Sequence, residues 1–232
     1  LVFGLMDVLN FGHGLFIALG AYIATSVAVS GGLGSVGIAM LLAMCAAGAF
    51  GIVFERLIVR PVYGQHLKQI LITMGGMIIG EELIKVVWGP LQIALPPPAM
   101  LQGAVIVADA AIERYRLLAV LVGLVVFLAQ LWVLSQTKLG LLIRAGVQDR
   151  EMVEALGYRI GRLFVGVFAA GSALAGLGGV MWAYYQQNVV PQIGTQLTVL
   201  IFIVIIIGGL GSTAGALIGA LLVGLMANYT GY

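Results

Sequence analysis

Charged residues are scarce in this sequence. Lysine, arginine, aspartate and glutamate together make up 9% of the 232 residues, whereas hydrophobic residues make up 62%. Because about a quarter of the residues in a soluble domain are charged, this composition excludes an ordinary soluble protein and predicts an integral membrane protein. The formal net charge of +2 is too small to indicate binding to nucleic acid.

Cysteine and the motifs of common active sites are also missing. Cys45 is the only cysteine, so neither an internal disulfide nor a CxxC redox motif is possible. No lysine follows a glycine, which excludes a GxxxxGK[ST] nucleotide-binding loop. HExxH and GxSxG motifs are absent, and His13 and His66 are far apart in sequence. The sequence therefore predicts no catalytic residue, no metal site and no cofactor in this chain.

Long apolar runs dominate what is present. They are continuous and do not alternate with polar residues, which favours transmembrane helices over an outer-membrane barrel. Five runs have about the length that spans a membrane: Phe11–Val29, Val36–Phe54, Leu67–Trp88, Leu117–Leu134 and Leu163–Tyr185. A broken or half-spanning helix pair is expected near the C-terminus, from the shorter runs Leu197–Ile207 and Ala214–Ala227. The predicted fold is all-α, a polytopic transmembrane helical bundle that forms a single transmembrane domain over residues 1–232. The chain begins inside an apolar run and ends without a polar tail, so we expect parts of the first and last helices to lie outside it.

Basic residues are distributed unevenly among the connectors. Eight of the eleven lie around the connector after the second run and in the window 137–162: Arg56, Arg60, Lys68, Lys138, Arg144, Arg150, Arg159 and Arg162. Two predicted spans separate these connectors, so both lie on the same side, and the positive-inside rule places that side in the cytoplasm. The connector 89–116 is then extracytoplasmic. Its segment Ala104–Ala108 predicts a strand of a small hairpin or flap, with a plain loop as the alternative.

The window 137–162, TKLGLLIRAGVQDREMVEALGYRIGR, is the longest polar stretch. It carries eight of the twenty charged residues. Within it, Asp149–Leu156 predicts a short amphipathic helix, with Met152, Val153 and Leu156 near one face. A long excursion into water predicts a docking element for a soluble partner, and a solvated connector that only orients the protein is the alternative.

Polar residues also interrupt the apolar runs. Asn10 and His13 are three residues apart, with Gly12 between them, which predicts a kink that lines a pathway through the membrane. The alternative is that Asn10 caps a helix starting at Phe11. The glycine-rich turn Gly208–Thr213 predicts backbone polar groups and hydroxyls at membrane depth, although Ser212 or Thr213 would also suit an N-cap.

Two carboxylates lie toward the outer end of the third run. Glu81 and Glu82 are four and three residues before Lys85, a spacing at which helical side chains form ion pairs. A stand-alone channel or secondary transporter would need an unpaired carboxylate in mid-membrane. Because the predicted ion pairs leave no such carboxylate here, a stand-alone channel or secondary transporter is kept only as the alternative function.

Several motifs together resemble the permease subunits of branched-chain amino acid ABC importers. They lie in order along the chain: GLMDVLNFGHG at 4–14, FIALGAY at 16–22, Glu55-Arg56 with Arg60-Pro61, the segment 144–157 ending in EALG, and GGLGSTAGA at 208–216. The resemblance implies a multi-pass subunit in the bacterial inner membrane. Its implied partners are a second homologous permease or a second copy of this chain, two cytoplasmic ATPase subunits and a periplasmic substrate-binding protein. The family carries leucine, isoleucine and valine, and similar permeases carry urea, short amides or other small organic acids.

The resemblance also implies roles for particular residues. Residues 149–157 take the position of the coupling helix that contacts an ATPase subunit: Asp149, Arg150, Glu151, Glu154, Ala155, Leu156 and Gly157. The predicted substrate pathway comprises Asn10, Gly12, His13, Gly208, Gly209, Ser212 and Thr213. ATP hydrolysis is expected on the partner subunits, so the chain is predicted to be a transport subunit and not an enzyme.

Overall fold

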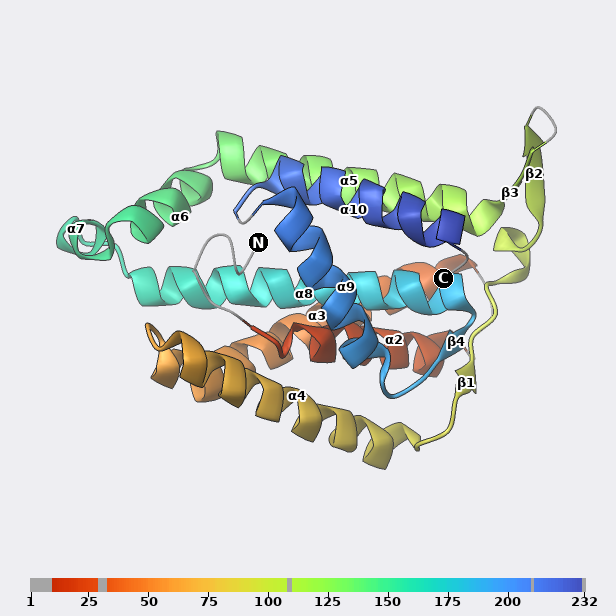
Figure 1. Ribbon diagram of the computed structural model, residues 1–232, viewed down its shortest axis with the longest axis horizontal. Coiled ribbons are helices and arrows are strands. Elements are labelled where there is room, and N and C mark those ends of the chain that lie inside the picture. The colour runs from red at the N-terminus through yellow and green to blue at the C-terminus, as the bar shows by residue number, and fades with distance from the viewer. Residues whose placement is uncertain (1–9, 29–32, 108–109, 210, 231–232) are drawn as a thin grey trace.

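The computed structural model describes residues 10–28, 33–107, 110–209 and 211–230, and most of them are helical (Figure 1). Seven helices coincide with the predicted apolar runs: α2 (His13–Ala28), α3 (Leu33–Phe54), α4 (His66–Trp88), α5 (Arg114–Gln136), α8 (Ile160–Gln186), α9 (Ile193–Gly208) and α10 (Thr213–Thr230). The helical bundle predicted from the sequence is therefore confirmed.

Three helical segments of the described chain are long and apolar enough to cross a membrane: residues 34–62, α5 and α8. The first is α3 together with a π-helical turn, η1 (Glu55–Val59), and a 3-10 turn, η2 (Arg60–Val62). Pro61 lies in η2 and has no backbone N–H to donate, which helps to end the helix there. α4 is as long as α5, but Lys68, Glu81, Glu82 and Lys85 interrupt its apolar sequence.

The C-terminal helices form a tight hairpin. The 16 residues of α9 rise about 24 Å, less than the hydrocarbon thickness of about 30 Å. α9 begins four residues before the predicted apolar run. The run missed this first turn because the turn contains the polar residues Thr195 and Gln196. A Cβ atom at Gly208 would lie only 2.3 Å from the carbonyl oxygen of Gly215, so glycine allows the two backbones to meet.

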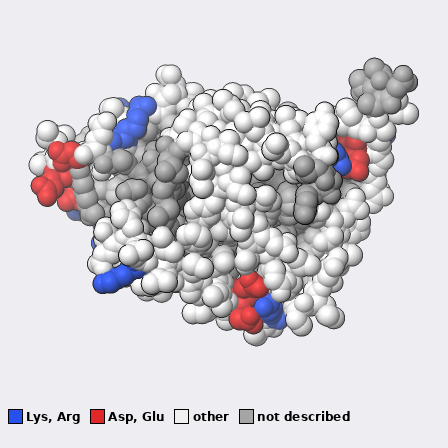
Figure 2. Space-filling model, viewed as in Figure 1, with Lys and Arg blue, Asp and Glu red and all other residues white. Residues whose placement is uncertain are grey.

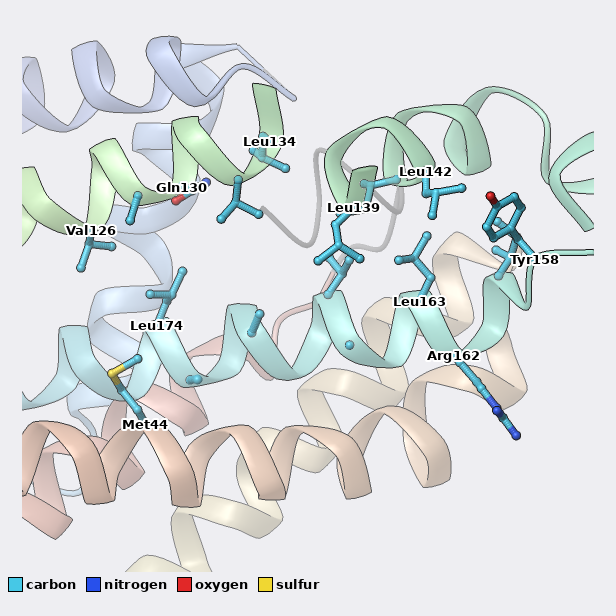
Figure 3. Close-up of a pocket in the computed structure, with 18 of the residues that line it drawn as sticks. Met44, Val126, Gln130, Leu134, Leu139, Leu142, Tyr158, Arg162, Leu163 and Leu174 are labelled. Atoms are coloured by element: carbon cyan, nitrogen blue, oxygen red, sulfur yellow. The ribbon is translucent and has the colours of Figure 1, made fainter. Parts of the chain in front are cut away.

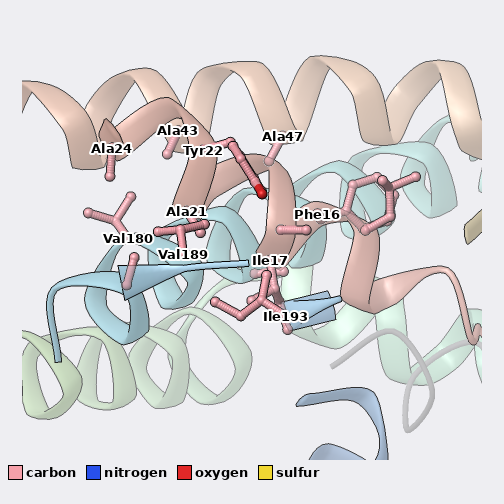
Figure 4. Packing of buried hydrophobic residues seen from close by; sticks show 14 of the residues in the cluster. Phe16, Ile17, Ala21, Tyr22, Ala24, Ala43, Ala47, Val180, Val189 and Ile193 are labelled. Atoms are coloured by element: carbon pink, nitrogen blue, oxygen red, sulfur yellow. The ribbon is translucent and has the colours of Figure 1, made fainter. Parts of the chain in front are cut away.

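α2 lies at the centre of the bundle, packed against α3, α4, α8 and α9 (Figures 1 and 4). Phe16, Ala21 and Tyr22 are fully buried in it. Helices in lipid associate through close packing at small residues, and α2 contacts α8 in this way. A Cβ atom at Gly20 would lie 2.0 Å from the Gly176 carbonyl oxygen, and one at Gly179 would lie 2.0 Å from that of Ile17.

The polar window contains two helices where one was expected. α7 (Arg150–Ala155) lies within the predicted range, and the Asp149 carboxylate caps it by accepting a hydrogen bond from the Met152 N–H at 2.9 Å. The preceding helix, α6 (Lys138–Gln148), was not predicted. Its apolar positions Leu139, Leu142 and Ile143 recur at helical spacing. Because charged residues surround them, the sequence indicated a polar connector at this place.

Two small antiparallel sheets lie at the end of the molecule away from α7 (Figure 1). β2 (Ala104–Val107) pairs with β3 (Ala110–Glu113), which confirms the predicted hairpin over its described residues. β1 (Ile93–Ala94) pairs with β4 (Asn188–Val189), a contact between distant segments that the sequence does not indicate, and a 3-10 turn, η3 (Ala99–Leu101), lies between β1 and β2. The connector 89–116 and the window 137–162 therefore lie at opposite ends. Their sides of the membrane stay a prediction.

Candidate functional site

Asn10 is a buried polar residue just before the start of α2. Its side chain is 7% exposed, and neither its amide nitrogen nor its amide oxygen has a hydrogen-bond partner among the described residues. The alternative prediction, that Asn10 caps a helix beginning at Phe11, is wrong: α2 begins at His13, and the Asn10 side chain accepts no bond from it. A buried polar group without a partner costs free energy, so this amide is available to a polar ligand or water.

Two residues of α4 complete this environment. The Phe11 N–H donates to the Thr73 hydroxyl at 3.2 Å, and that hydroxyl donates in turn to the Gln69 carbonyl oxygen at 2.7 Å. Gln69 and Thr73 are buried, and the Gln69 side-chain oxygen has no partner among the described residues. The sequence analysis missed both, although they are four residues apart in an otherwise apolar run and so share one helix face.

The end of α3 reaches the same place. A Cβ atom at Gly12 would lie 2.6 Å from the Phe54 ring, so glycine is required where the chain passes that ring. Phe54 also packs against Phe16 and Phe168, with ring centroids 5.5 and 6.3 Å away. We call the meeting point of the start of α2, the end of α3 and the first half of α4 the α2–α3–α4 junction.

His13 lies differently from Asn10. It is half-buried in the first turn of α2, and its ring meets the edge of Phe16 at 6.2 Å between centroids. Asn10 precedes the helix, so the two side chains do not lie on one face of α2. The structure therefore places His13 in the first turn of α2 and Asn10 just before it.

The Gly208–Thr213 turn has a structural role in the hairpin. The Ser212 hydroxyl accepts a hydrogen bond from the Gly215 N–H at 2.9 Å, so the alternative prediction that Ser212 is an N-cap is confirmed. Gly209 adopts a φ of 82°, which favours glycine. α9 approaches the start of α2 through Phe202, whose ring stacks on Phe11 at 4.5 Å. Gly208 lies further along α9, so the turn is separate from the junction.

The predicted ion pairs on α4 are confirmed. The Lys85 ammonium lies 2.7 Å from a Glu82 carboxylate oxygen and 3.4 Å from one of Glu81. The second Glu81 oxygen accepts a hydrogen bond from the Thr195 hydroxyl on α9 at 3.0 Å. Both carboxylates are thus occupied locally, which disfavours the coupling-ion site that a secondary transporter would need.

α7 projects from one end of the molecule (Figure 1), and Figure 2 shows charged side chains clustered there and in a few other patches. Met152 and Leu156 are 61% and 71% exposed, whereas Val153 is buried against Ile160 and Phe164 of α8. Glu151, Glu154 and Ala155 are exposed. The predicted apolar face is therefore divided: one side chain anchors α7, and two face outward. Gly157 ends the turn with a φ of 88°. The side chain of Arg150 lies outside the described structure.

A cavity of about 820 Å³ separates the second half of α5 from α8 (Figure 3). Its lining is almost entirely apolar and comes mainly from α5, α6 and α8, while the Arg162 guanidinium points away from it. α5 is attached near both ends: the Tyr115 hydroxyl donates to the Met181 carbonyl oxygen at 2.6 Å, and α6 packs on Ile160 and Phe164. The cavity thus lies between these two attachments, beside the second half of α5.

These features define a multi-pass helical membrane protein with an exposed helix pair at one end and buried polar groups within the bundle. They are typical of a membrane transport subunit, and comparison with known proteins identifies its family. The chain belongs to the family described as branched-chain amino acid transport system, permease component, whose model matches residues 1–232. It is a permease component of a transport system. The resemblance found in the sequence is therefore confirmed.

Individual relatives agree with the family match. The high-affinity branched-chain amino acid transport system permease protein BraD of Pseudomonas aeruginosa is 29% identical, over 97% of this chain and 77% of BraD. The corresponding permease protein LivH of Escherichia coli K12 is 26% identical over the same shares. A probable permease protein LivM of Methanocaldococcus jannaschii is 30% identical over 38% of this chain and 26% of its own length. No solved structure matches the chain.

Proposed function

We propose that this chain and a second permease subunit, or a second copy of itself, form the translocation path of an ATP-driven importer for branched-chain or similar small amino acids. The substrate class comes from the names of the relatives. Two separate cytoplasmic subunits hydrolyse ATP, and a periplasmic binding protein delivers the substrate. The protein lies in the bacterial inner membrane, with residues 137–162 in the cytoplasm.

The exposed side of α7 is the observation that carries this proposal. Met152 and Leu156 leave apolar surface in water, beside the carboxylates of Glu151 and Glu154. Exposed apolar side chains within a polar rim are typical of a protein–protein interface. α7 therefore provides a short, anchored surface on which an ATPase subunit docks as a coupling helix. Movement of that subunit pulls on α6 and α8, and the cavity beside α5 allows α5 and α6 to shift.

The substrate path passes the α2–α3–α4 junction. A zwitterion with an apolar side chain needs a few polar partners in a largely apolar path, and Asn10 offers there an amide that is unpaired among the described residues. His13 and Gly12 adjoin it along the chain. The Gly208–Thr213 turn is the second candidate segment, through backbone groups at Gly208 and Gly209 in addition to the Ser212 cap.

The partner subunits provide the test of this proposal. We expect the tagged full-length protein, purified in mild detergent from its native membrane, to bring down two ATPase subunits and a second permease. In proteoliposomes that hold ATP on the side of the ATPase subunits and the binding protein on the opposite side, leucine uptake should require ATP. Uptake that follows an ion gradient and ignores ATP would establish the secondary-transporter alternative, and ATP-driven uptake of urea without leucine would change the substrate class.

Asn10→Leu tests the pathway. Leucine keeps the branching of asparagine at Cγ and removes only its polar groups, so we expect abundance in the membrane to stay near normal. Loss of a hydrogen bond to the substrate costs about 1–2 kcal/mol, which corresponds to an uptake about 5- to 30-fold slower at low substrate concentration. Radiolabelled leucine uptake per unit of membrane-inserted protein measures this. Asn228→Leu, at an exposed amide on α10, is the control. Equal losses of uptake and abundance for Asn10→Leu would indicate a structural role.

A further inference from the structure

Tyr63 connects the anchor of α7 with the end of α3. Its ring meets Phe164 of α8 edge-on, with centroids 6.4 Å apart and an angle of 86° between the planes. Phe164 belongs to the small apolar cluster in which Val153 anchors α7. From the same ring, the Tyr63 hydroxyl donates to the carboxylate of Glu55 at 2.7 Å. One side chain therefore contacts both the apolar cluster that anchors α7 and the carboxylate at the end of α3.

Glu55 is an unusual residue for its position. It is 1% exposed and begins the π-helical turn η1, which packs against α4. Its second carboxylate oxygen has no hydrogen-bond partner among the described residues. Burial of a carboxylate is costly, and an apolar side chain of similar size would fill the space at lower cost. π-helical turns are rare and occur frequently at functional sites. The carboxylate therefore calls for an explanation other than packing.

Phe54, the residue before Glu55, borders the proposed substrate path. Phe54 contacts the backbone at Gly12, two residues after Asn10, and its ring also lies against Gly76 of α4. A rotation or shift of η1 moves Phe54, because Phe54 directly precedes Glu55, the first residue of η1, in one helical segment. Since aromatic side chains pack tightly around Phe54, it cannot move without displacing the start of α2.

We propose that the Tyr63–Glu55 hydrogen bond transmits the movement of α7 to the α2–α3–α4 junction. This inference rests on the proposed function and adds two positioning residues to it. When an ATPase subunit moves α7, the cluster of Val153, Ile160 and Phe164 carries Tyr63 with it. The hydroxyl holds Glu55, and η1 then repositions Phe54 beside the path.

The experiment compares ATP hydrolysis with transport in the reconstituted full complex. Tyr63→Phe keeps the ring on Phe164 and removes only the hydroxyl. We expect the number of leucine molecules imported per ATP hydrolysed to fall about tenfold, while complex assembly and thermal stability stay near those of the unchanged protein. Glu55→Gln keeps a neutral acceptor and should give a smaller loss. Tyr229→Phe removes a hydroxyl from a tyrosine that is 88% exposed, and should leave the ratio unchanged.

The double variant separates a link from two independent contributions. If the hydrogen bond transmits the movement, Tyr63→Phe with Glu55→Gln lowers the ratio no further than Tyr63→Phe alone, because contributions through one contact are not additive. An unchanged ratio in Tyr63→Phe, or a loss of stability and uptake together at a constant ratio, overturns the link. In either case ATP-dependent uptake by the unchanged protein leaves the proposed function standing. Uptake independent of ATP in the unchanged protein overturns both.

Discussion

Replacement of Gly179 by alanine is expected to destabilise the protein far more than the same replacement at Gly178. A Cβ atom at position 179 would lie 2.0 Å from the Ile17 carbonyl oxygen and 3.0 Å from the Ala21 nitrogen, both backbone atoms of α2. Neither can move aside without shifting the central helix. Overpacking in a core costs about 1–3 kcal/mol and occasionally more, and a backbone contact this close places Gly179→Ala at the upper end.

The measurement is the thermal stability of the detergent-solubilised protein. Its readout is the fraction of protein that stays monodisperse after heating to each temperature. A loss of about 3 kcal/mol corresponds to a midpoint about 6–12 °C lower for a chain of this size. At Gly178 no atom lies within 4 Å of the added carbon in the described structure, so Gly178→Ala should shift the midpoint little. Similar midpoints for the two variants would mean that α2 and α8 are not packed as closely as described.

Leu156→Asp is expected to abolish most of the transport without affecting the fold. Leu156 is 71% exposed at the end of α7, so the substitution removes no packing from the core. It places a charge where we expect an apolar contact with the ATPase subunit. Central interface residues contribute about 2 kcal/mol or more when they are removed, which corresponds to an affinity about 30-fold weaker. The tagged variant should retain normal abundance, but recover little ATPase subunit and import little leucine.

Two comparisons make this prediction specific. Leu91→Asp introduces the same charge at a leucine that is 78% exposed in the connector 89–116, and it should retain the ATPase subunits. Val153→Asp, at a side chain that is 4% exposed on the inner side of α7, should instead reduce abundance or stability. Full recovery of ATPase subunits with Leu156→Asp would remove α7 from the interface.

Interactions within single segments were predictable from the sequence. Hydropathy located the seven apolar helices, five from runs of about twenty residues and two from shorter runs, because insertion of a helix into lipid depends on the composition of that segment. The Glu82–Lys85 pair and the Asp149 cap follow from fixed spacings along one helix. The helix α6 was overlooked for a different reason: its charged residues Lys138 and Arg144 masked an apolar face that does follow helical spacing.

The residues of the candidate site required the tertiary structure. Asn10 is polar by sequence, but its burial, with an amide that has no partner in the described part of the chain, depends on helices that follow it. Glu55 directly follows the predicted span Val36–Phe54, and only the fold shows that it is buried and accepts a hydrogen bond from Tyr63.

The sequence by itself determined that this protein is a helical membrane protein and where its apolar helices lie. These properties depend on how each segment interacts with lipid and water. The tertiary structure decided which glycines are indispensable, which side of α7 is outward and which polar groups meet inside the bundle. Gly178 and Gly179 are adjacent and chemically identical, and only the position of α2 distinguishes them. Such contacts join residues distant in sequence, so no local pattern encodes them.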